Sequence, residues 1–363
     1  MRYFMPVDVY EENDCIKTHA DCWTKFGKKA LVVTGSHSAF KNGAYKDLEE
    51  VAHTKGVDLV LFKEVEENPS VDTVMKARDF GLAEKVDFVI GLGGGSAMDA
   101  AKAIALMLAH PKADASYLYA KGDSTTLPIV CIPTTCGTGS EVTGVSVLTR
   151  KDLQVKGSIP HKIFAQVALI DGKYLLNAPL QMLRNTAIDA LAHLWESYLN
   201  PNASDYSRMC VVAGLEVWKQ NKDVLLGQQA LELGQAFAMM RAACFGGMAI
   251  AQTGTSLPHG LSYSLTVHQG LAHGLACGYF LAGYLLQAEA KERDYLLHLA
   301  GFTSLEQWQD FYKAVCLKIP LDKVALEKAK NSLLANPAKL KNAPFKVDEK
   351  VLEAIIYEGN HYE

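Results

Sequence analysis

Apolar positions in the first half of the chain fall into short β-branched runs separated by amphipathic helical patterns. The β-branched runs occupy 29–33, 57–62, 86–93 and 127–133. The helical patterns lie between them, near 42–54, 70–84 and 96–109. Alternation of this kind predicts a parallel sheet covered by helices on both faces. The pattern also predicts two strands within 142–159, joined by a polar turn at Arg150–Asp152, and one more at 166–171.

Beyond about residue 178 the pattern becomes helical throughout, and β-branched runs nearly vanish. Helical spacing continues through LQMLRNTAIDALAHLWESYL and on to FAMMRAACFGGMAIAQ. A chain of 363 residues favours two domains. The sequence therefore predicts an α/β domain over 1–178 and an all-helical domain over 179–363.

A glycine turn separates one predicted strand from the following helix in VIGLGGGSAMDAAKAIALML, residues 89–108. Gly94 and Gly95 let a ligand approach the backbone, and Ser96 with Asp99 predicts a capped helix start. Free amides at a helix N-terminus suit a pyrophosphate. The spacing departs from GxGxxG, so the alternative is a tight connection without a ligand.

A second polar loop follows the strand at 127–133, in PTTCGTGSEVTG (133–144). Thr134, Thr135 and Thr138 supply hydroxyls to this loop. Ligands of open parallel sheets bind beyond the carboxyl ends of the strands, so both loops are expected to line one nucleotide crevice. Cys136 lies within the loop and is interpreted as small apolar filler.

Polar residues with ligand chemistry interrupt the apolar helical half at two places. Asp189 and His193 stand one turn apart in NTAIDALAHLWESYLN, so both lie on one helix face. His259, His268 and His273 follow in HGLSYSLTVHQGLAHGLACGYFL. Imidazole with carboxylate suits Zn²⁺ or Fe²⁺. Without further context, the alternative is ordinary surface polarity.

Composition narrows the class of protein and its partners. The chain is 49% hydrophobic and 21% charged, as in ordinary globular proteins. A net charge of −4 predicts neither nucleic-acid nor membrane-surface binding, and no apolar run approaches the ~18 residues of a membrane span. The acidic N-terminus is not typical of a signal peptide. Eight cysteines without a CxxC pair indicate reduced thiols and a cytoplasmic location.

Four motifs in this order resemble the iron-containing (group III) alcohol dehydrogenases: GLGGGSAMDAAKAIA, PTTCGTGSEVT, DALAHLWESYLN and HGLSYSLTVHQGLAHGLACG. The resemblance covers roughly residues 28 to 285. It implies the dehydroquinate synthase-like fold of that family, with a Rossmann-like N-terminal domain, an all-α C-terminal domain and a cleft between them for NAD(P) and a divalent metal. The ligands that it implies for Fe²⁺ or Zn²⁺ are Asp189, His193, His259 and His273.

The resemblance also implies which residues contact the nicotinamide cofactor. These are Gly94, Gly95, Ser96 and Asp99 at the pyrophosphate, Thr134, Thr135 and Thr138 in the threonine loop, and Lys156. Members that prefer NAD tend to carry an aspartate after the first strand. This chain has Gly35, Ser36 and Ser38 there, with Lys41 nearby, which favours NADP(H) because hydroxyls, amides and a cation suit a 2′-phosphate. A loop that accepts either cofactor is the alternative.

A second departure concerns proton transfer. The family often has a histidine four residues after the third ligand, and this chain has Tyr263 at that position. Tyr263 is therefore a candidate for moving a proton, with pocket shaping as the alternative.

The resemblance implies a metal-dependent alcohol dehydrogenase, or aldehyde reductase in the reverse direction, acting on a small substrate as a homodimer or higher homo-oligomer. A polyol or glycerol-phosphate dehydrogenase of the same superfamily is one alternative. A metal-free relative like the maleylacetate reductases is disfavoured because all four ligand positions are filled. A nucleotide-binding protein without catalytic activity is the alternative from another class.

Overall fold

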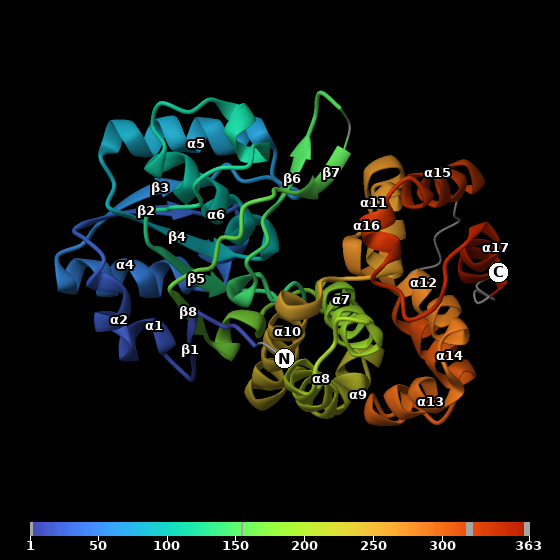
Figure 1. The fold of residues 1–363 in the computed structure, drawn as a ribbon. Coiled ribbons are helices and arrows are strands. Elements are labelled where there is room, and N and C mark those ends of the chain that lie inside the picture. The colour runs from blue at the N-terminus through green and yellow to red at the C-terminus, as the bar shows by residue number, and fades with distance from the viewer. Residues whose placement is uncertain (1–2, 154, 317–321, 359–363) are drawn as a thin grey trace. The chain divides into compact units, whose positions relative to one another are not determined.

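The computed structural model describes residues 3–153, 155–316 and 322–358, and its contacts form two compact units (Figure 1). The α/β unit comprises Met5–Thr135 and Gly139–Ala178. The helical unit comprises the described residues of Met1–Phe4, Cys136–Thr138 and Pro179–Glu363. The main division falls between Ala178 and Pro179, and the short segment Cys136–Thr138 packs with the helical unit although α/β segments precede and follow it.

The α/β unit is built on a six-stranded sheet in the order β1-β8-β5-β4-β2-β3, and every neighbouring pair is parallel. Its strands are β1 (Asp8–Glu11), β2 (Lys29–Val33), β3 (Asp58–Phe62), β4 (Phe88–Gly93), β5 (Ile129–Pro133) and β8 (Val167–Ile170). From β2 the chain runs outward to β3 and then returns to β4 on the other side of β2. The topological switch point therefore lies between β2 and β4.

Helices cover both faces of this sheet, as the strand–helix alternation predicts. The unit's helices are α1 (Cys15–Thr18), α2 (Ala20–Thr24), α3 (Ser38–Lys41), α4 (Ala44–Lys55), α5 (Val71–Glu84) and α6 (Gly95–Ala109), with 3₁₀ turns η1 (Ala115–Tyr119), η2 (Ser140–Val142) and η3 (Gly172–Leu175). Alternate residues of β2 enter different cores: Leu31 and Val33 pack with α5 and α6, whereas Ala30 and Val32 pack with α1, α2 and α4.

Two features of the strands add detail to the predicted pattern. The segment 142–159 forms an antiparallel hairpin of β6 (Val147–Arg150) and β7 (Val155–Ser158), separate from the main sheet. The edge strand β1 was not predicted, because its sequence DVYE has only two apolar residues. It forms through backbone pairing with β8, from Asp8 opposite Val167 to Glu11 opposite Ile170.

The helical unit consists of helices joined by short connections. Its elements are α7 (Leu180–Leu199), α8 (Asp205–Trp218), η4 (Lys219–Asn221), α9 (Lys222–Leu226), α10 (Leu233–Thr253), α11 (Leu257–Gln269), α12 (His273–Gln287), α13 (Ala290–Leu299), α14 (Leu305–Val315), α15 (Lys323–Leu334), α16 (Pro337–Leu340), α17 (Glu349–Glu353) and the π-helical turn η5 (Ala354–Glu358). Helix α7 packs against α8, α10 and α12, which makes it the centre of the unit.

One described helix, α10, is long and apolar enough to cross a membrane by length and composition alone. In the structure, 56% of its apolar window is buried within the protein. Burial of this kind is typical of a core helix that packs against its neighbours, here α7 and α8.

Candidate metal and nucleotide sites

The metal-ligand candidates on α7 lie inside the helical unit. Residues 187–197 of this helix are buried all round, so Asp189 and His193 are polar groups within the core, only 3% and 5% exposed. The surface-polarity alternative is wrong for this pair. Buried polar groups need partners. Histidines from two other helices, α11 and α12, lie beside Asp189.

His259 and His273 occupy the first turns of α11 and α12. His259 is the third residue of α11 and is 2% exposed, whereas His273 is the first residue of α12 and its side chain is 23% exposed. Both helices lack a side-chain N-cap. The positive end of a helix disfavours extra positive charge, which suits a neutral imidazole that offers a lone pair.

Hydrogen bonds fix all three imidazoles in one tautomer. Nδ1–H of His259 donates to Glu196 Oε1 at 2.6 Å, and Nδ1–H of His193 donates to the Gly137 carbonyl at 3.3 Å. Ser262 Oγ donates to the His259 carbonyl at 2.8 Å, so its lone pair accepts Nδ1–H of His273 at 3.3 Å. Each ring therefore keeps Nε2 as the free electron pair, as a metal-binding imidazole does.

Two of these imidazole nitrogens lie near the Asp189 carboxylate without a hydrogen bond to it. His259 Nε2 lies 3.4 Å from Asp189 Oδ1, and His273 Nε2 lies 3.8 Å from the same oxygen. Neither Asp189 Oδ1 nor His259 Nε2 has a hydrogen-bond partner among the described residues, and both atoms are buried. Buried acceptors that converge in this way require a positive charge between them. A divalent cation fits the donor set.

The pKa shifts of Asp189, His193 and His259 also indicate that this site favours a positive charge. Burial would raise the pKa of Asp189, but the charges of His193 and His273 outweigh burial and hold that pKa well below its usual value. Burial lowers the pKa of His193 to about 4, so its ring is neutral near pH 7. Burial also disfavours a charged His259, yet Cys277, Glu196 and Asp189 raise its pKa well above normal. The negative groups around His259 therefore favour a positive charge at this place.

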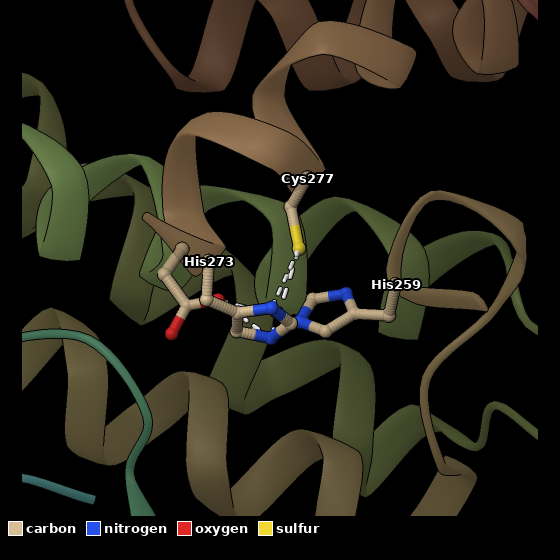
Figure 2. A group of neighbouring side chains, drawn as sticks. His259, His273 and Cys277 are labelled. Carbon is tan, nitrogen blue, oxygen red and sulfur yellow. Dashed lines mark hydrogen bonds and ion pairs between the residues drawn. The ribbon is translucent and has the colours of Figure 1, made fainter. Parts of the chain in front are cut away.

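A cysteine joins the ligand group. One donor atom from each of Asp189, His259, His273 and Cys277 lies within 4.8 Å of all the others. Figure 2 shows the Cys277 sulfur directed at the His273 ring, with the His259 ring beside it. His193 is outside this group and instead stacks on His259, with ring centroids 4.4 Å apart. Three of the four predicted ligands therefore converge with a residue that the sequence did not indicate.

The sequence also missed Glu196, a fully buried carboxylate on α7. Besides the His259 imidazole, it accepts hydrogen bonds from the backbone amides of Ser256 and His259. The available signal was its position seven residues after Asp189 and three after His193, which puts all three on one face of α7. Glu196 orients His259 and makes its Nε2 more basic.

Replacing Glu196 with alanine is expected to lower metal affinity about 10- to 100-fold, because the His259 ring loses the acceptor that fixes it. Glu196→Gln keeps an acceptor oxygen and is expected to recover part of the affinity. Competition with a chromophoric chelator measures both variants. Wild-type affinity in Glu196→Ala would show that Glu196 does not position His259.

In the α/β unit, the glycine turn lies at the topological switch point. Gly93 ends β4 with φ 149°, and a Cβ on Gly94 would lie 3.1 Å from the Thr135 side chain. The predicted capping is wrong. Helix α6 begins at Gly95 with Gly94 as its N-cap, so Ser96 is already inside the helix and its Oγ accepts the Asn68 amide at 3.2 Å.

Asp99 is likewise engaged away from the helix start. Its two carboxylate oxygens accept from Ser140 Oγ at 2.5 Å and from the Val147 amide at 2.9 Å. The fully buried Lys102 ammonium lies 3.6 Å from Asp99 and donates to Ser140 Oγ at 2.8 Å. Asp99 thus ties the segment after β5 to α6.

Two threonines at strand ends border the glycine turn. Thr34 follows β2 and Thr134 follows β5, and both hydroxyls are buried without a hydrogen-bond partner in the described part of the chain. Unsatisfied donors beside an uncapped helix start suit phosphate oxygens. Thr34 was not predicted. Thr138 belongs to the helical unit, whereas Thr134 and Thr135 belong to the α/β unit.

The remaining predicted cofactor residues lie at the ends of β2 and in the hairpin. Gly35 is partly exposed after β2, and Ser36 and Ser38 are fully on the surface, so their hydroxyls are open to a ligand. Lys156 in β7 donates to Asn68 Oδ1 at 2.6 Å, and Asn68 is the residue whose amide meets Ser96. The hairpin and the glycine turn are thereby connected.

Tyr263 stacks on His273, with ring centroids 5.7 Å apart and planes 11° apart. Burial raises the pKa of its phenol to about 12, so the side chain is neutral near pH 7. A phenol of this pKa is a poor proton acceptor. The stacking contact supports a role in holding the His273 ring, and proton transfer by Tyr263 stays a prediction.

Comparison with known proteins gives matches over both units. Residues 6–172 match the family described as iron-containing alcohol dehydrogenase, and residues 184–318 match its C-terminal domain family. Long-chain-alcohol dehydrogenase 1 of Geobacillus thermodenitrificans is 31% identical over 80% of this chain and 75% of its own length. Sulfoacetaldehyde reductase of Bilophila wadsworthia is 31% identical over 71% of this chain and 67% of its own. An iron-containing alcohol dehydrogenase structure from Thermotoga maritima superimposes with a TM-score of 0.91 at 33% identity, over 99% of each chain.

Proposed function

The chain belongs to the iron-containing alcohol dehydrogenase family, and we propose that it interconverts small alcohols and aldehydes with NADP(H) and a divalent metal held by Asp189, His193, His259 and His273. When bound, the metal supplies Lewis acidity toward the substrate oxygen and the nicotinamide supplies or accepts the hydride. The family supports a divalent metal and a nicotinamide cofactor. The choice of NADP(H) and the ligand roles are our proposal.

The protein's own contribution is to prepare the site before any ligand arrives. Glu196, Ser262 and the Gly137 carbonyl hold three imidazoles with Nε2 available, so little reorganisation is needed for binding. Asp189 supplies the negative charge that a buried cation requires. The observation that carries the proposal is the buried, unpartnered pair of Asp189 Oδ1 and His259 Nε2.

The direct test is an activity screen on protein reconstituted with Fe²⁺ or Zn²⁺. NADPH with short aldehydes is expected to lose the nicotinamide absorbance, and a chelator is expected to abolish that loss. Glycerol and its phosphates in the same panel test the polyol alternative. Full activity after chelation would contradict the metal role, and cofactor binding without turnover of any aldehyde or alcohol would favour the inactive alternative.

The cofactor preference rests on the segment after β2. Gly35 lies in the place where an aspartate would repel a 2′-phosphate, and its backbone is outside the left-handed region. A Cβ there would lie 3.4 Å from the Val65 carbonyl, an ordinary contact, so a side chain fits without a backbone shift.

Gly35→Asp is therefore expected to lower the ratio of kcat/KM for NADPH to that for NADH by about 10-fold or more, since like-charge repulsion of ~1.4 kcal/mol suffices. Steady-state kinetics with both cofactors measure the ratio. Gly35→Asn has nearly the same shape without the charge and is the matched control. An equal effect of both variants would mean that shape rather than charge decides the preference.

We further propose a cytoplasmic homo-oligomer. The support for a reducing compartment is that all eight cysteines are free thiols in the structure, and six of them are buried. Size measurement in solution tests the oligomeric state.

A further inference from the structure

We propose that Cys277 supplies a thiolate ligand to the divalent ion, beside Asp189, His259 and His273, so that the metal site contains sulfur. The inference rests on the proposed function only in requiring that a divalent ion binds here. The four-residue ligand set implied by the family does not include this cysteine.

The spacing of the donor atoms is close to that of a coordination shell, since all four atoms lie within 4.8 Å of one another. Bonds of about 2.0–2.1 Å to nitrogen or oxygen and about 2.3 Å to sulfur place tetrahedral ligand atoms roughly 3.3–3.6 Å apart. Cys277 Sγ lies 3.8 Å from His273 Nε2, which lies 3.8 Å from Asp189 Oδ1. Asp189 Oδ1 in turn lies 3.4 Å from His259 Nε2. Small side-chain movements bring all four atoms to one centre.

The Cys277 sulfur contacts the His273 ring, whose Nε2 is the atom proposed to bind the metal. Its Nδ1 is occupied by Ser262 Oγ, and the Cys277 sulfur is nearer to Nε2 than to Nδ1, at 3.8 against 4.0 Å. Cys277 stands one turn after His273 on α12, so both side chains project from the same face. The sulfur therefore lies against the His273 ring, nearly equidistant from its two nitrogens and within reach of an ion bound at Nε2.

Charge balance with a divalent ion also favours a thiolate here. Cys277 and Asp189 are buried, and a thiolate with a carboxylate balances the two positive charges of the ion within the protein. The thiol proton is released to solvent as the metal–sulfur bond forms. The unpartnered atoms Asp189 Oδ1 and His259 Nε2 are aimed at the same centre. A soft sulfur donor would shift the site's preference toward Zn²⁺ relative to a set of nitrogen and oxygen ligands.

Cobalt substitution provides a readout that does not depend on turnover. Metal-free protein reconstituted with Co²⁺ is expected to show a near-ultraviolet thiolate-to-cobalt charge-transfer band together with visible d–d bands. Cys277→Ala and Cys277→Ser are expected to lose the charge-transfer band while keeping d–d bands. Cys244→Ala removes another buried thiol of the helical unit that lies outside the ligand group, and it is expected to keep both.

The outcomes separate this inference from the proposed function. Visible d–d bands without a charge-transfer band in the wild type would overturn the sulfur ligand and leave the metal-dependent function intact. A charge-transfer band that persists in both Cys277 variants would also overturn it. Absence of any Co²⁺ binding would overturn both proposals together.

X-ray absorption of the zinc-loaded wild type decides the question if the Cys277 variants fail to fold. A sulfur shell at about 2.3 Å is expected for a bound thiolate. A shell of nitrogen and oxygen alone would overturn the inference.

Discussion

Replacing Asp189 with asparagine is expected to abolish metal retention and to lower kcat/KM for aldehyde reduction by about 10³-fold. The carboxylate is the one anionic ligand in the implied set, and its oxygen is the point on which His259 and His273 converge. Loss of roughly 4 kcal/mol of transition-state stabilisation, as expected when a catalytic cation is lost, corresponds to that factor. Elemental analysis of the purified protein and steady-state kinetics measure the two effects.

Asp310→Asn is the matched control, because Asp310 is exposed on α14 and the same charge is removed. It is expected to retain wild-type metal content and activity. Full metal content and turnover in Asp189→Asn would mean that the cation binds elsewhere. Circular dichroism that matches the wild type would show that the loss is not a failure to fold.

Much of the architecture could be predicted from the sequence, because strands that are buried on both faces have continuous apolar sequences. The continuous apolar runs at β2, β4 and β5 and the change of pattern near Ala178 reflect two different kinds of core. Strand β1 has no such apolar run, since its pairing with β8 uses backbone groups and its side chains are mostly half-buried. The N-cap of α6 was misplaced by two residues because glycine serves as the N-cap without a side chain.

The metal site was only partly predictable for a related reason. Asp189 and His193 share a helix turn, so periodicity alone puts them on one face. Glu196 and Cys277 act across helices: Glu196 bonds His259 over 63 positions of sequence, and the Cys277 sulfur meets Asp189 from another helix. Contacts between residues so far apart in the sequence depend on how closely α7, α11 and α12 approach one another. The periodicity of a single helix does not show that distance. Two glycines of α12 control that approach for α7.

These glycines, Gly274 and Gly278, let α12 lie directly against α7. A Cβ on Gly274 would lie 1.7 Å from the Asn185 carbonyl oxygen and 3.1 Å from the Asp189 amide. A Cβ on Gly278 would lie 2.5 Å from Ile188 Cγ2. The first clash is with backbone, which cannot rotate away as a side chain can. The helices must separate if Gly274 gains a methyl group.

Gly274→Ala is therefore expected to lower the free energy of unfolding by about 3 kcal/mol, at the upper end of the usual cost of overpacking. Separation of α12 from α7 also moves His273 and Cys277 away from Asp189, so metal affinity is expected to fall with stability. Urea titration measures the first effect and chelator competition the second. A fall in both the free energy of unfolding and the metal affinity is the result expected if the substitution moves α12 away from α7.

Gly234→Ala on α10 is the matched control for this substitution. A Cβ at Gly234 has nothing within 4 Å, so the change is expected to stabilise the protein by up to about 1 kcal/mol through the lower entropy of the unfolded chain. Metal affinity should be unchanged in this variant. If Gly274→Ala unfolded at the wild-type urea concentration and kept its metal, close packing of α12 on α7 would not be what brings the ligands together.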